Sequence, residues 1–419
     1  MPNSKMSAVA VAEPEVRRPT SVAPVPAPAT PIRSAWPIYA EDEIAEVSEV
    51  LRSGRVNALH HGERCRAFEA VYAARCERPH AIAVANGTLA LELALRALGL
   101  GPGDEVIVPA RSFVASASCV VTIGATPIFA DVDPDSQTVN ASTIAAALTP
   151  RTRAVIVVHL AGWPAPMDEI MTLAEALGLA VVEDCAQAHG ATRDGHSVGA
   201  FGDAAAFSFC TDKIISTGGE GGLLVLRDEA AWKRAWAFKD HGKTPPEDPP
   251  PPNNGRFRWL HHSVGSNYRM TEMQAGIGLR QLEKLERWIA DRNRNAAILD
   301  RHLAALPAMR VPQAPPSVRH AYYKYYAFVR PDRLREGWSR DRIVGTLIAC
   351  GIPAGTGSCP EIYREAAFVG SPSAPLAPLA VSKMLGETSL MLPCDQTLCI
   401  ADVERMAQTV VSVMSKASY

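Results

Sequence analysis

Short apolar runs alternate with segments of helical periodicity between residues 81 and 226. The run 153–160, Arg-Ala-Val-Ile-Val-Val-His-Leu, is nearly continuous in apolar residues, which is typical of a strand covered on both faces. This alternation predicts an α/β fold with a mainly parallel central sheet and helices on both faces. Further strands are expected at 81–85, 105–109, 126–132, 179–184 and 223–226, and at the run that begins at 205.

The remaining segments suggest how the chain is divided. Residues 1–35 are rich in Pro and Ala, which favours an extended, disordered tail. We expect a large domain over 36–290 and a smaller C-terminal α+β domain over 291–419. A long helix is predicted from about 271 to 306, and the proline-rich stretch 244–255 is predicted to be a long loop of unassigned role.

Composition excludes several functional classes. The formal charge is −2, with 42 Lys and Arg against 44 Asp and Glu, so no field attracts nucleic acid or an anionic membrane. The nine cysteines are scattered without a CxxC pair, which favours a reducing cytosol over disulfides or a metal site. No secretory signal and no membrane span is expected, so the predicted location is cytoplasmic.

Three local features predict a binding site. An apolar strand runs into Asn-Gly87-Thr88 and then a strong helix, so the helix N-terminus offers free N–H groups and a hydroxyl to a phosphate. Asp184 closes another strand, where α/β sheets bind ligands. Lys213 lies between two apolar runs, with Ser208 shortly before it and a glycine cluster after it. Taken singly, each has an ordinary structural alternative: a cap at Thr88, a cap at Asp184, or a surface lysine on a hairpin turn.

Together these groups are what pyridoxal 5′-phosphate requires. Its phosphate needs N–H and hydroxyl donors, its pyridine nitrogen needs a carboxylate to stay protonated, and its aldehyde needs a lysine amine. A nearby cationic ring also lowers the pKa of such a lysine toward that of a useful base. His189 is either a ligand contact or a packing histidine whose hydrogen bonds are satisfied within the fold.

Several long motifs occur in an order that resembles the DegT/DnrJ/StrS aminotransferases, sugar aminotransferases of the pyridoxal-phosphate-dependent fold type I. They are ANGTLALELALRALGLGPGDEVIVP (85–109), ATPIFADVD (125–133), VVEDCAQAHGA (181–191), FSFCTDK (207–213) with GGEGG (218–222), and NYRMTEMQAGIG (267–278).

The resemblance implies a role for each matching position. Lys213 matches the lysine that bonds to the cofactor, Asp184 the partner of the pyridine nitrogen, and Gln187 the residue against the ring's hydroxyl. Gly87, Thr88 and Ser208 match the phosphate cradle, and Phe113 the aromatic residue that stacks on the ring. Asn267 matches a residue that reaches the phosphate in the neighbouring subunit, which implies a homodimer with shared sites.

The implied activity is transfer of an amino group from an amino acid, L-glutamate or L-glutamine, to a keto-sugar that is expected to be nucleotide-linked. A keto-cyclitol or a free keto-sugar acid stays open as the acceptor. The related sugar dehydratases carry histidine in place of Lys213, and a dinucleotide-binding protein would need a GxGxxG turn that the chain lacks. A catalytically silent regulator would need Lys213 or Asp184 to be lost, and both are present.

Three departures from the family fall where relatives bind the acceptor: Arg111, Lys324 and the stretch 355–360. Arg111 precedes Phe113 closely, so it is expected either to contact a substrate carboxylate or phosphate, or to lie on the surface at the start of a helix.

Overall fold

The computed structural model of the chain describes residues 30–58, 62–245, 259–371 and 373–419. The predicted tail up to residue 29 lies outside these residues, and so does the proline-rich stretch from 246 onward.

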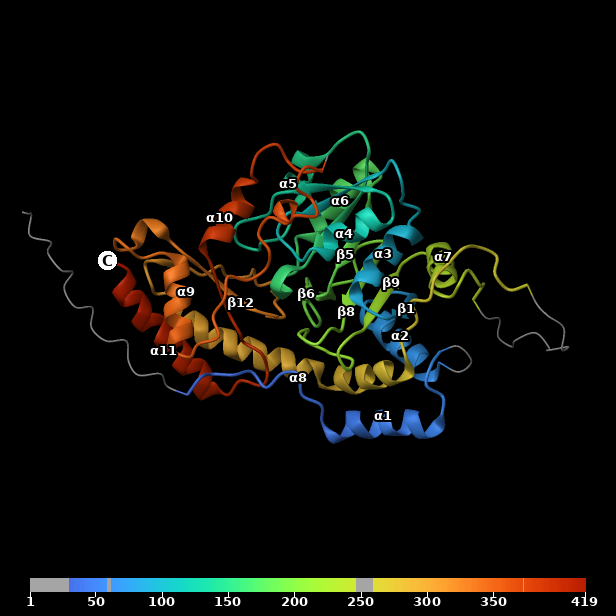
Figure 1. Ribbon diagram of the computed structural model, residues 1–419, viewed down its shortest axis with the longest axis horizontal. Coiled ribbons are helices and arrows are strands. Elements are labelled where there is room, and N and C mark those ends of the chain that lie inside the picture. The colour runs from blue at the N-terminus through green and yellow to red at the C-terminus, as the bar shows by residue number, and fades with distance from the viewer. Residues whose placement is uncertain (1–29, 59–61, 246–258, 372) are drawn as a thin grey trace, which may run out of the picture.

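A seven-stranded sheet forms the centre of the molecule (Figure 1), with the strand order β1-β9-β8-β5-β4-β2-β3. Neighbouring strands are parallel except where β9 pairs with β1 and β8. The predicted mainly parallel sheet is therefore confirmed. The strands are β1 (His80–Val84), β2 (Glu105–Pro109), β3 (Thr126–Ala130), β4 (Thr152–Val158), β5 (Ala180–Asp184), β8 (Ala204–Ser208) and β9 (Gly222–Leu226).

Both faces of this sheet are buried, because alternate residues of each strand enter different apolar clusters. On one face Val106, Ile156 and Val182 pack with α3 (Gly87–Ala97), α4 (Ala115–Thr122) and α7 (Glu229–Lys239). The other face packs against α2 (Glu63–Arg75), α5 (Ala141–Ala147), α6 (Met167–Leu177) and the start of α8. This burial explains why the strands read as continuous apolar runs.

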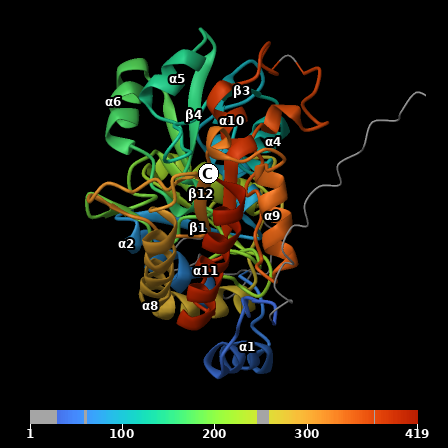
Figure 2. The ribbon, with the colours of Figure 1, turned by 90° about the vertical axis from the view of Figure 1, so that its left-hand side faces the viewer.

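The C-terminal part is organised around α8 (Glu272–Leu303), which also packs against α1 (Glu41–Ser53) and α2. Helix α11 (Ile400–Ala417) lies along α8 (Figures 1 and 2). A small sheet of order β10-β12-β13 joins them. Its strands and the accompanying elements are β10 (Met309–Arg310), β12 (Tyr325–Val329), β13 (Ser389–Leu392), α9 (Arg340–Ala349) and α10 (Ala380–Thr388).

A third sheet has the order β11-β6-β7, and three short 3-10 helices complete the described elements. These are β6 (Thr192–Arg193), β7 (His196–Ser197), β11 (Val318–Arg319), η1 (Leu160–Gly162), η2 (Pro331–Arg333) and η3 (Ile362–Arg364). The expected domain boundary at 290 falls inside α8, and the division into two domains stays a prediction.

Two element starts differ from expectation. Helix α4 begins at Ala115 and not near Ser112, because Ser112 pairs as an isolated antiparallel bridge with Cys359. The run 323–329 predicts a strand from Tyr323, whereas strand β12 begins at Tyr325. Within the described ranges, no helix has both the length and the apolar character that crossing a bilayer requires.

Candidate active site

The carboxyl ends of β1, β5 and β8 meet at one edge of the sheet, because these strands run in the same direction. A cavity of about 670 Å³ opens there. This edge is where open α/β sheets bind their ligands. The cavity wall includes seven of the eight predicted site residues: Gly87, Thr88, Phe113, Asp184, Gln187, Ser208 and Lys213. Asn267 is exposed and is not part of this wall.

The first part of the wall is the turn from β1 into α3. Asn86 caps the helix, and its side chain accepts a hydrogen bond of 3.0 Å from the N–H of Leu89. The N–H of Ala90 is bound to the carbonyl of Asn86. The N–H groups of Gly87 and Thr88 thus stay available at the positive end of the helix dipole, which suits an anion.

Glycine is required at position 87 by a close approach to β8. A Cβ added to Gly87 would lie 2.6 Å from the Cβ of Ser208, a separation that real side chains do not tolerate. Gly222 on β9 is similarly constrained, because its Cβ would lie 2.2 Å from the carbonyl oxygen of Asn86. These contacts hold the helix N-terminus against the end of β8 and bring the Ser208 hydroxyl to the predicted phosphate cradle.

Asp184 lies at the end of β5 and is 6% exposed. Its Oδ2 accepts a hydrogen bond of 2.9 Å from Ser116, and its Oδ1 accepts one of 3.1 Å from the N–H of Ala186. Burial raises the pKa of the Asp184 carboxyl above its ordinary value of 3.8, against the opposing effect of these two donors. A buried carboxylate of this kind is stabilised by a cation placed beside it.

Two further predicted residues lie on the same wall. Gln187 is buried, and its Oε1 accepts a hydrogen bond of 2.8 Å from the N–H of Ala161, which fixes the orientation of the amide. Phe113 is 64% exposed although it lines the cavity, so its ring is open to a ligand.

Lys213 lies in the loop between β8 and β9, and its side chain is 16% exposed. Its Nζ is 3.5 Å from Oδ1 of Asp212 and 5.1 Å from the centre of the Tyr323 ring. The Tyr323 hydroxyl donates a hydrogen bond to the other oxygen of Asp212. Burial acts to raise the pKa of Asp212, but Lys213 and Tyr323, with a smaller effect of Lys324, leave this pKa below its ordinary value.

The opposite wall comes from the C-terminal part of the chain: Tyr323, Lys324, Tyr326, 357–359 and Met391. The hydroxyl of Tyr326 accepts a hydrogen bond of 2.9 Å from the N–H of Ser358, which connects two segments of this wall. Two of the three departures from the family, Lys324 and the stretch 355–360, therefore lie at the cavity.

Both expectations for Arg111 are wrong. Its side chain is neither on the surface nor part of the cavity wall, because Arg111 is fully buried behind the C-terminal wall. The guanidinium donates to Oε1 of Gln137 at 2.8 Å and to Oγ of Ser389 at 3.2 Å, and lies 5.7 Å from the centre of the Tyr326 ring. Arg111 therefore supports the wall from behind.

His189 is a packing residue and not a ligand contact. It is fully buried and lies outside the cavity wall. Its Nδ1 is hydrogen-bonded to the hydroxyl of Tyr72 at 2.5 Å, and its Nε2 donates to the carbonyl of Ser208 at 2.8 Å. Burial lowers the pKa of His189 to about 3, so the ring is neutral at physiological pH.

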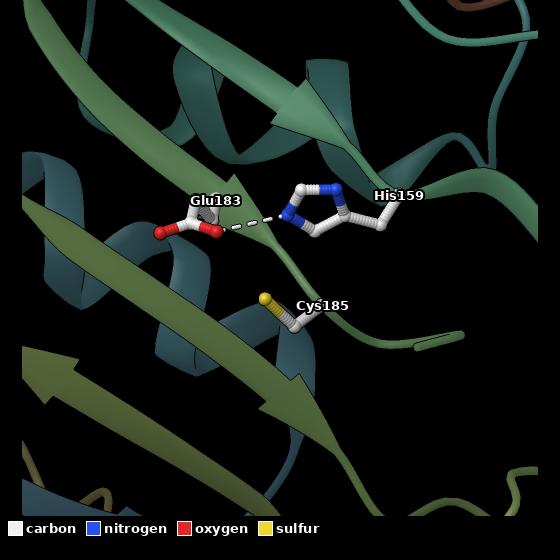
Figure 3. A group of neighbouring side chains, drawn as sticks. All are labelled: His159, Glu183 and Cys185. Carbon is white, nitrogen blue, oxygen red and sulfur yellow. Dashed lines mark hydrogen bonds and ion pairs between the residues drawn. The ribbon is translucent and has the colours of Figure 1, made fainter. Parts of the chain in front are cut away.

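Figure 3 shows His159, Glu183 and Cys185, whose donor atoms lie close enough to hold a metal ion. The hydrogen bonds of this cluster account for it without a metal. Nε2 of His159 bonds to Glu183 at 2.9 Å, while Nδ1 accepts from the N–H of Ala165 at 3.0 Å. Glu183 also accepts three backbone N–H groups, from Gly199, Phe201 and Gly202.

The chemistry of the Cys185 thiol agrees with a structural role for this cluster. Burial raises the pKa of Cys185 well above its ordinary value, so the thiol packs here as a neutral group. Successive residues of β5 point to opposite faces, so Glu183 and Cys185 support the strand end that presents Asp184.

The sequence did not single out Ser116, Asp212 or Tyr323, which contact the predicted catalytic residues. Ser116 lies four residues after Ser112 in sequence, and their hydroxyl groups are hydrogen-bonded at 2.9 Å. Asp212 is next to Lys213 in sequence, which was a usable signal for a charge partner. Tyr323 comes from a segment far along the chain, so only the tertiary fold places it there.

The model of the DegT/DnrJ/EryC1/StrS aminotransferase family matches residues 37–411. The chain belongs to this family. It is accordingly an aminotransferase, and the predicted family and fold class are confirmed. The family is one of pyridoxal-phosphate-dependent aminotransferases, and a candidate sugar aminotransferase from Streptococcus pneumoniae, 25% identical to the chain, has been solved in a PLP form and in a PMP form.

Individual relatives act on sugars and cyclitols. The chain is 39% identical over 352 residues to a GDP-perosamine synthase of Caulobacter vibrioides, covering 83% of this chain and 89% of that protein. It is 35% identical to an L-glutamine:2-deoxy-scyllo-inosose aminotransferase of Streptomyces kanamyceticus, with 76% of each chain covered. An aminotransferase structure from Psychrobacter cryohalolentis is 45% identical, with a TM-score of 0.89, covering 91% of this chain and 98% of that one.

Proposed function

We propose that the enzyme transfers an amino group from an amino acid, L-glutamate or L-glutamine, to a keto-sugar. The products are then the 2-oxo acid of the donor and an amino-sugar. The observation that carries this proposal is one cavity that contains Lys213, the buried acid Asp184 and the glycine turn at Gly87.

The residues present fit pyridoxal phosphate. Gly87, Thr88 and Ser208 would hold the phosphate, and the absence of a Cβ at Gly87 keeps the cradle closed against β8. Asp184 would accept a hydrogen bond from the protonated pyridine nitrogen, since its burial favours a cationic partner. Lys213 would bond to the aldehyde. When bound, the cofactor supplies an electron sink at the substrate's α-carbon and carries the amino group between the two substrates.

The chain's own groups would then position and move protons. Nζ of Lys213, released when the donor amine takes its place, would act as a general base at the substrate's α-carbon and then as a general acid. Asp212 and Tyr323 would hold that amine in place from the outer side. Phe113 and Gln187 would support the ring from the remaining sides.

The acceptor is proposed to be a nucleotide-linked keto-sugar, in line with the activity in the name of the Caulobacter relative. A keto-cyclitol is the second candidate, favoured by the Streptomyces relative. Lys324 and 357–359, which depart from the usual family pattern, line the wall that would face the acceptor.

We further propose a homodimer. Asn267 lies outside the cavity of its own chain, so a role in phosphate binding requires a second copy of the chain. An Asn267→Ala enzyme should bind pyridoxal phosphate more weakly while the single chain stays folded. A cytoplasmic location remains a prediction.

The transaminase proposal is tested with purified enzyme loaded with pyridoxal phosphate. L-glutamate or L-glutamine alone should convert the yellow enzyme to its colourless pyridoxamine form, and a keto-sugar should restore the colour. A protein that stays colourless after loading, or a yellow protein that no amino acid converts, would contradict the proposal.

A further inference from the structure

Lys324 is the second lysine of the cavity, and the transamination described above gives it no role. It lines the C-terminal wall just before β12. Its Nζ lies 5.1 Å from the centre of the Tyr323 ring, the same distance as Nζ of Lys213. The two ammonium groups are therefore within twice that distance of each other. Asp212 fixes this ring by accepting a hydrogen bond from the Tyr323 hydroxyl.

Bonding of Lys213 to the cofactor would change which charged groups of the cavity wall can bind a substrate. Among the described residues that line the cavity, the acids are Asp184, Asp212 and Glu220, and the only cations are Lys213 and Lys324. Asp212 is paired with Lys213, whereas no described carboxylate lies within 4.0 Å of Lys324. With Lys213 bonded to the cofactor, Lys324 would be the one remaining cation that these residues offer to an anionic substrate, and its charge acts on Asp212 only from beyond ion-pair distance.

Every amino-acid donor has a carboxylate on the carbon that carries its reacting amine. A carboxylate oxygen lies about 3 Å from that amine, and a hydrogen bond from an ammonium adds about 2.8 Å. Because the donor amine would replace Lys213 at the cofactor, its carboxylate would come within reach of Nζ of Lys324, which lies as close to the Tyr323 ring as Nζ of Lys213 does. The diphosphate of a nucleotide-sugar lies further from the reacting carbon than this.

We propose that the ammonium group of Lys324 binds the α-carboxylate of the amino-acid donor. The proposal rests on the transaminase function proposed above and adds the residue that recognises the donor. Lysine suits this task because its flexible stem lets a point charge follow the carboxylate as the substrate reacts.

The test compares wild type with Lys324→Met, Lys324→Arg and the control Lys233→Met, whose lysine is exposed and paired only with Glu229 on α7. The donor is whichever of L-glutamate, L-glutamine, L-alanine and L-aspartate converts wild type fastest, and it is paired with its own α-amide. Single-turnover spectra give the rate and the half-saturating concentration for each. Calorimetry with the α-methyl form of the donor, which has no α-hydrogen to lose, gives binding without reaction.

Wild type should favour the free donor over its α-amide by about tenfold to hundredfold, the effect of one charge-assisted hydrogen bond. In Lys324→Met this preference should fall to within about threefold, because both ligands lose the same partner. Lys324→Arg should keep most of the preference, and the α-methyl ligand should bind Lys324→Met correspondingly more weakly. The limiting rate and the control should change little.

Two results would overturn the proposal. One is an unchanged preference for the free donor in a folded Lys324→Met enzyme that still binds the cofactor. The other is a loss confined to the return reaction with the keto-sugar, which would assign Lys324 to the acceptor's diphosphate. A wild-type protein that fails to turn yellow would instead disprove the transaminase function itself.

Discussion

The two walls of the cavity are built differently. The cofactor-side wall comes from strand ends of the central sheet, where Gly87 and Gly222 allow backbone to touch backbone and Asp184 is anchored by two hydrogen bonds. The C-terminal wall comes from Tyr323–Tyr326 and 357–359, segments far along the chain. There the pairing of β12 with β13 and the bridge to Cys359 are supplemented by the side chains of Tyr326 and Arg111.

The first wall carries the family motifs and the second carries the departures. This contrast predicts that the first wall serves the proposed transamination and the second wall serves the choice of substrate. Changes in the first wall should therefore impair both half-reactions, and changes in the second should impair only one.

The largest effect is expected for Lys213→Ala. Loss of the covalent attachment and of the general base should lower kcat with donor and acceptor by at least about a thousandfold. The measurement is steady-state transamination, with Lys233→Ala as the matched control on a surface helix. Normal turnover by Lys213→Ala would show that this residue of the first wall is not needed for either half-reaction.

Asp184→Asn should be next, with kcat about a hundredfold to a thousandfold lower in both half-reactions, because an amide cannot keep the pyridine nitrogen charged. Ser116→Ala, which removes one hydrogen bond to Asp184, should cost about tenfold or less. Equal rates of the amino-donor half-reaction in wild type and Asp184→Asn would refute this role.

Asp184→Asn, which should impair catalysis, should stabilise the cofactor-free protein. Burial raises the Asp184 pKa above 3.8 in the folded protein, so ionisation of this carboxyl lowers the free energy of unfolding. The loss develops as the pH rises from the pKa of the unfolded protein to that of the folded protein. Cofactor-free Asp184→Asn should thus have a larger free energy of unfolding than wild type at pH 7, and the difference should shrink as pH falls toward 3.8. Denaturant titrations at both pH values measure it, and a pH-independent difference would argue against the shift.

Gly87→Ala should weaken cofactor binding and lower the free energy of unfolding by about 1–3 kcal/mol, since the new methyl group must push the end of β8 away. Gly345→Ala is the matched control, because no atom lies within 4 Å of its added Cβ on helix α9, and it should stabilise by about 0.5–1 kcal/mol. Cofactor titration and thermal unfolding compare the two. Identical behaviour would mean that the cradle is looser than the contact at Ser208 implies.

The smallest catalytic effect is expected for Arg111→Ala. Loss of a buried side chain and its hydrogen bonds should lower the free energy of unfolding by about 2–4 kcal/mol. The KM of the acceptor should rise about tenfold, or about 1.4 kcal/mol, because Tyr326 and 357–359 lose their support. The rate of the amino-donor half-reaction should stay within about twofold of wild type. Arg333→Ala, on an exposed turn, is the control. An equal loss in both half-reactions would show that Arg111 serves both walls.

The sequence was sufficient for the first wall and insufficient for the second. The strands were predictable because burial on both faces leaves continuous apolar runs. Asp184 ends one of these strands, and Gly87 and Lys213 come shortly after two others. The start of α4 was not predictable, because Ser112 is drawn out of the helix by a bridge to Cys359, far along the chain. Arg111 reads as a surface residue by type, and only the tertiary fold buries it behind Tyr326. Asn267 lies outside the cavity, so its predicted contact with the phosphate stays a prediction that requires a second chain.

The central claim is that Lys213 and no other residue bonds to the cofactor. Borohydride reduction of the enzyme loaded with pyridoxal phosphate, followed by proteolysis and mass spectrometry, tests it directly. We predict that the added cofactor mass appears on the peptide that contains Lys213, in about one copy per chain. Modification of a peptide that contains Lys324 or any other lysine in its place, or no modification at all, would contradict the account.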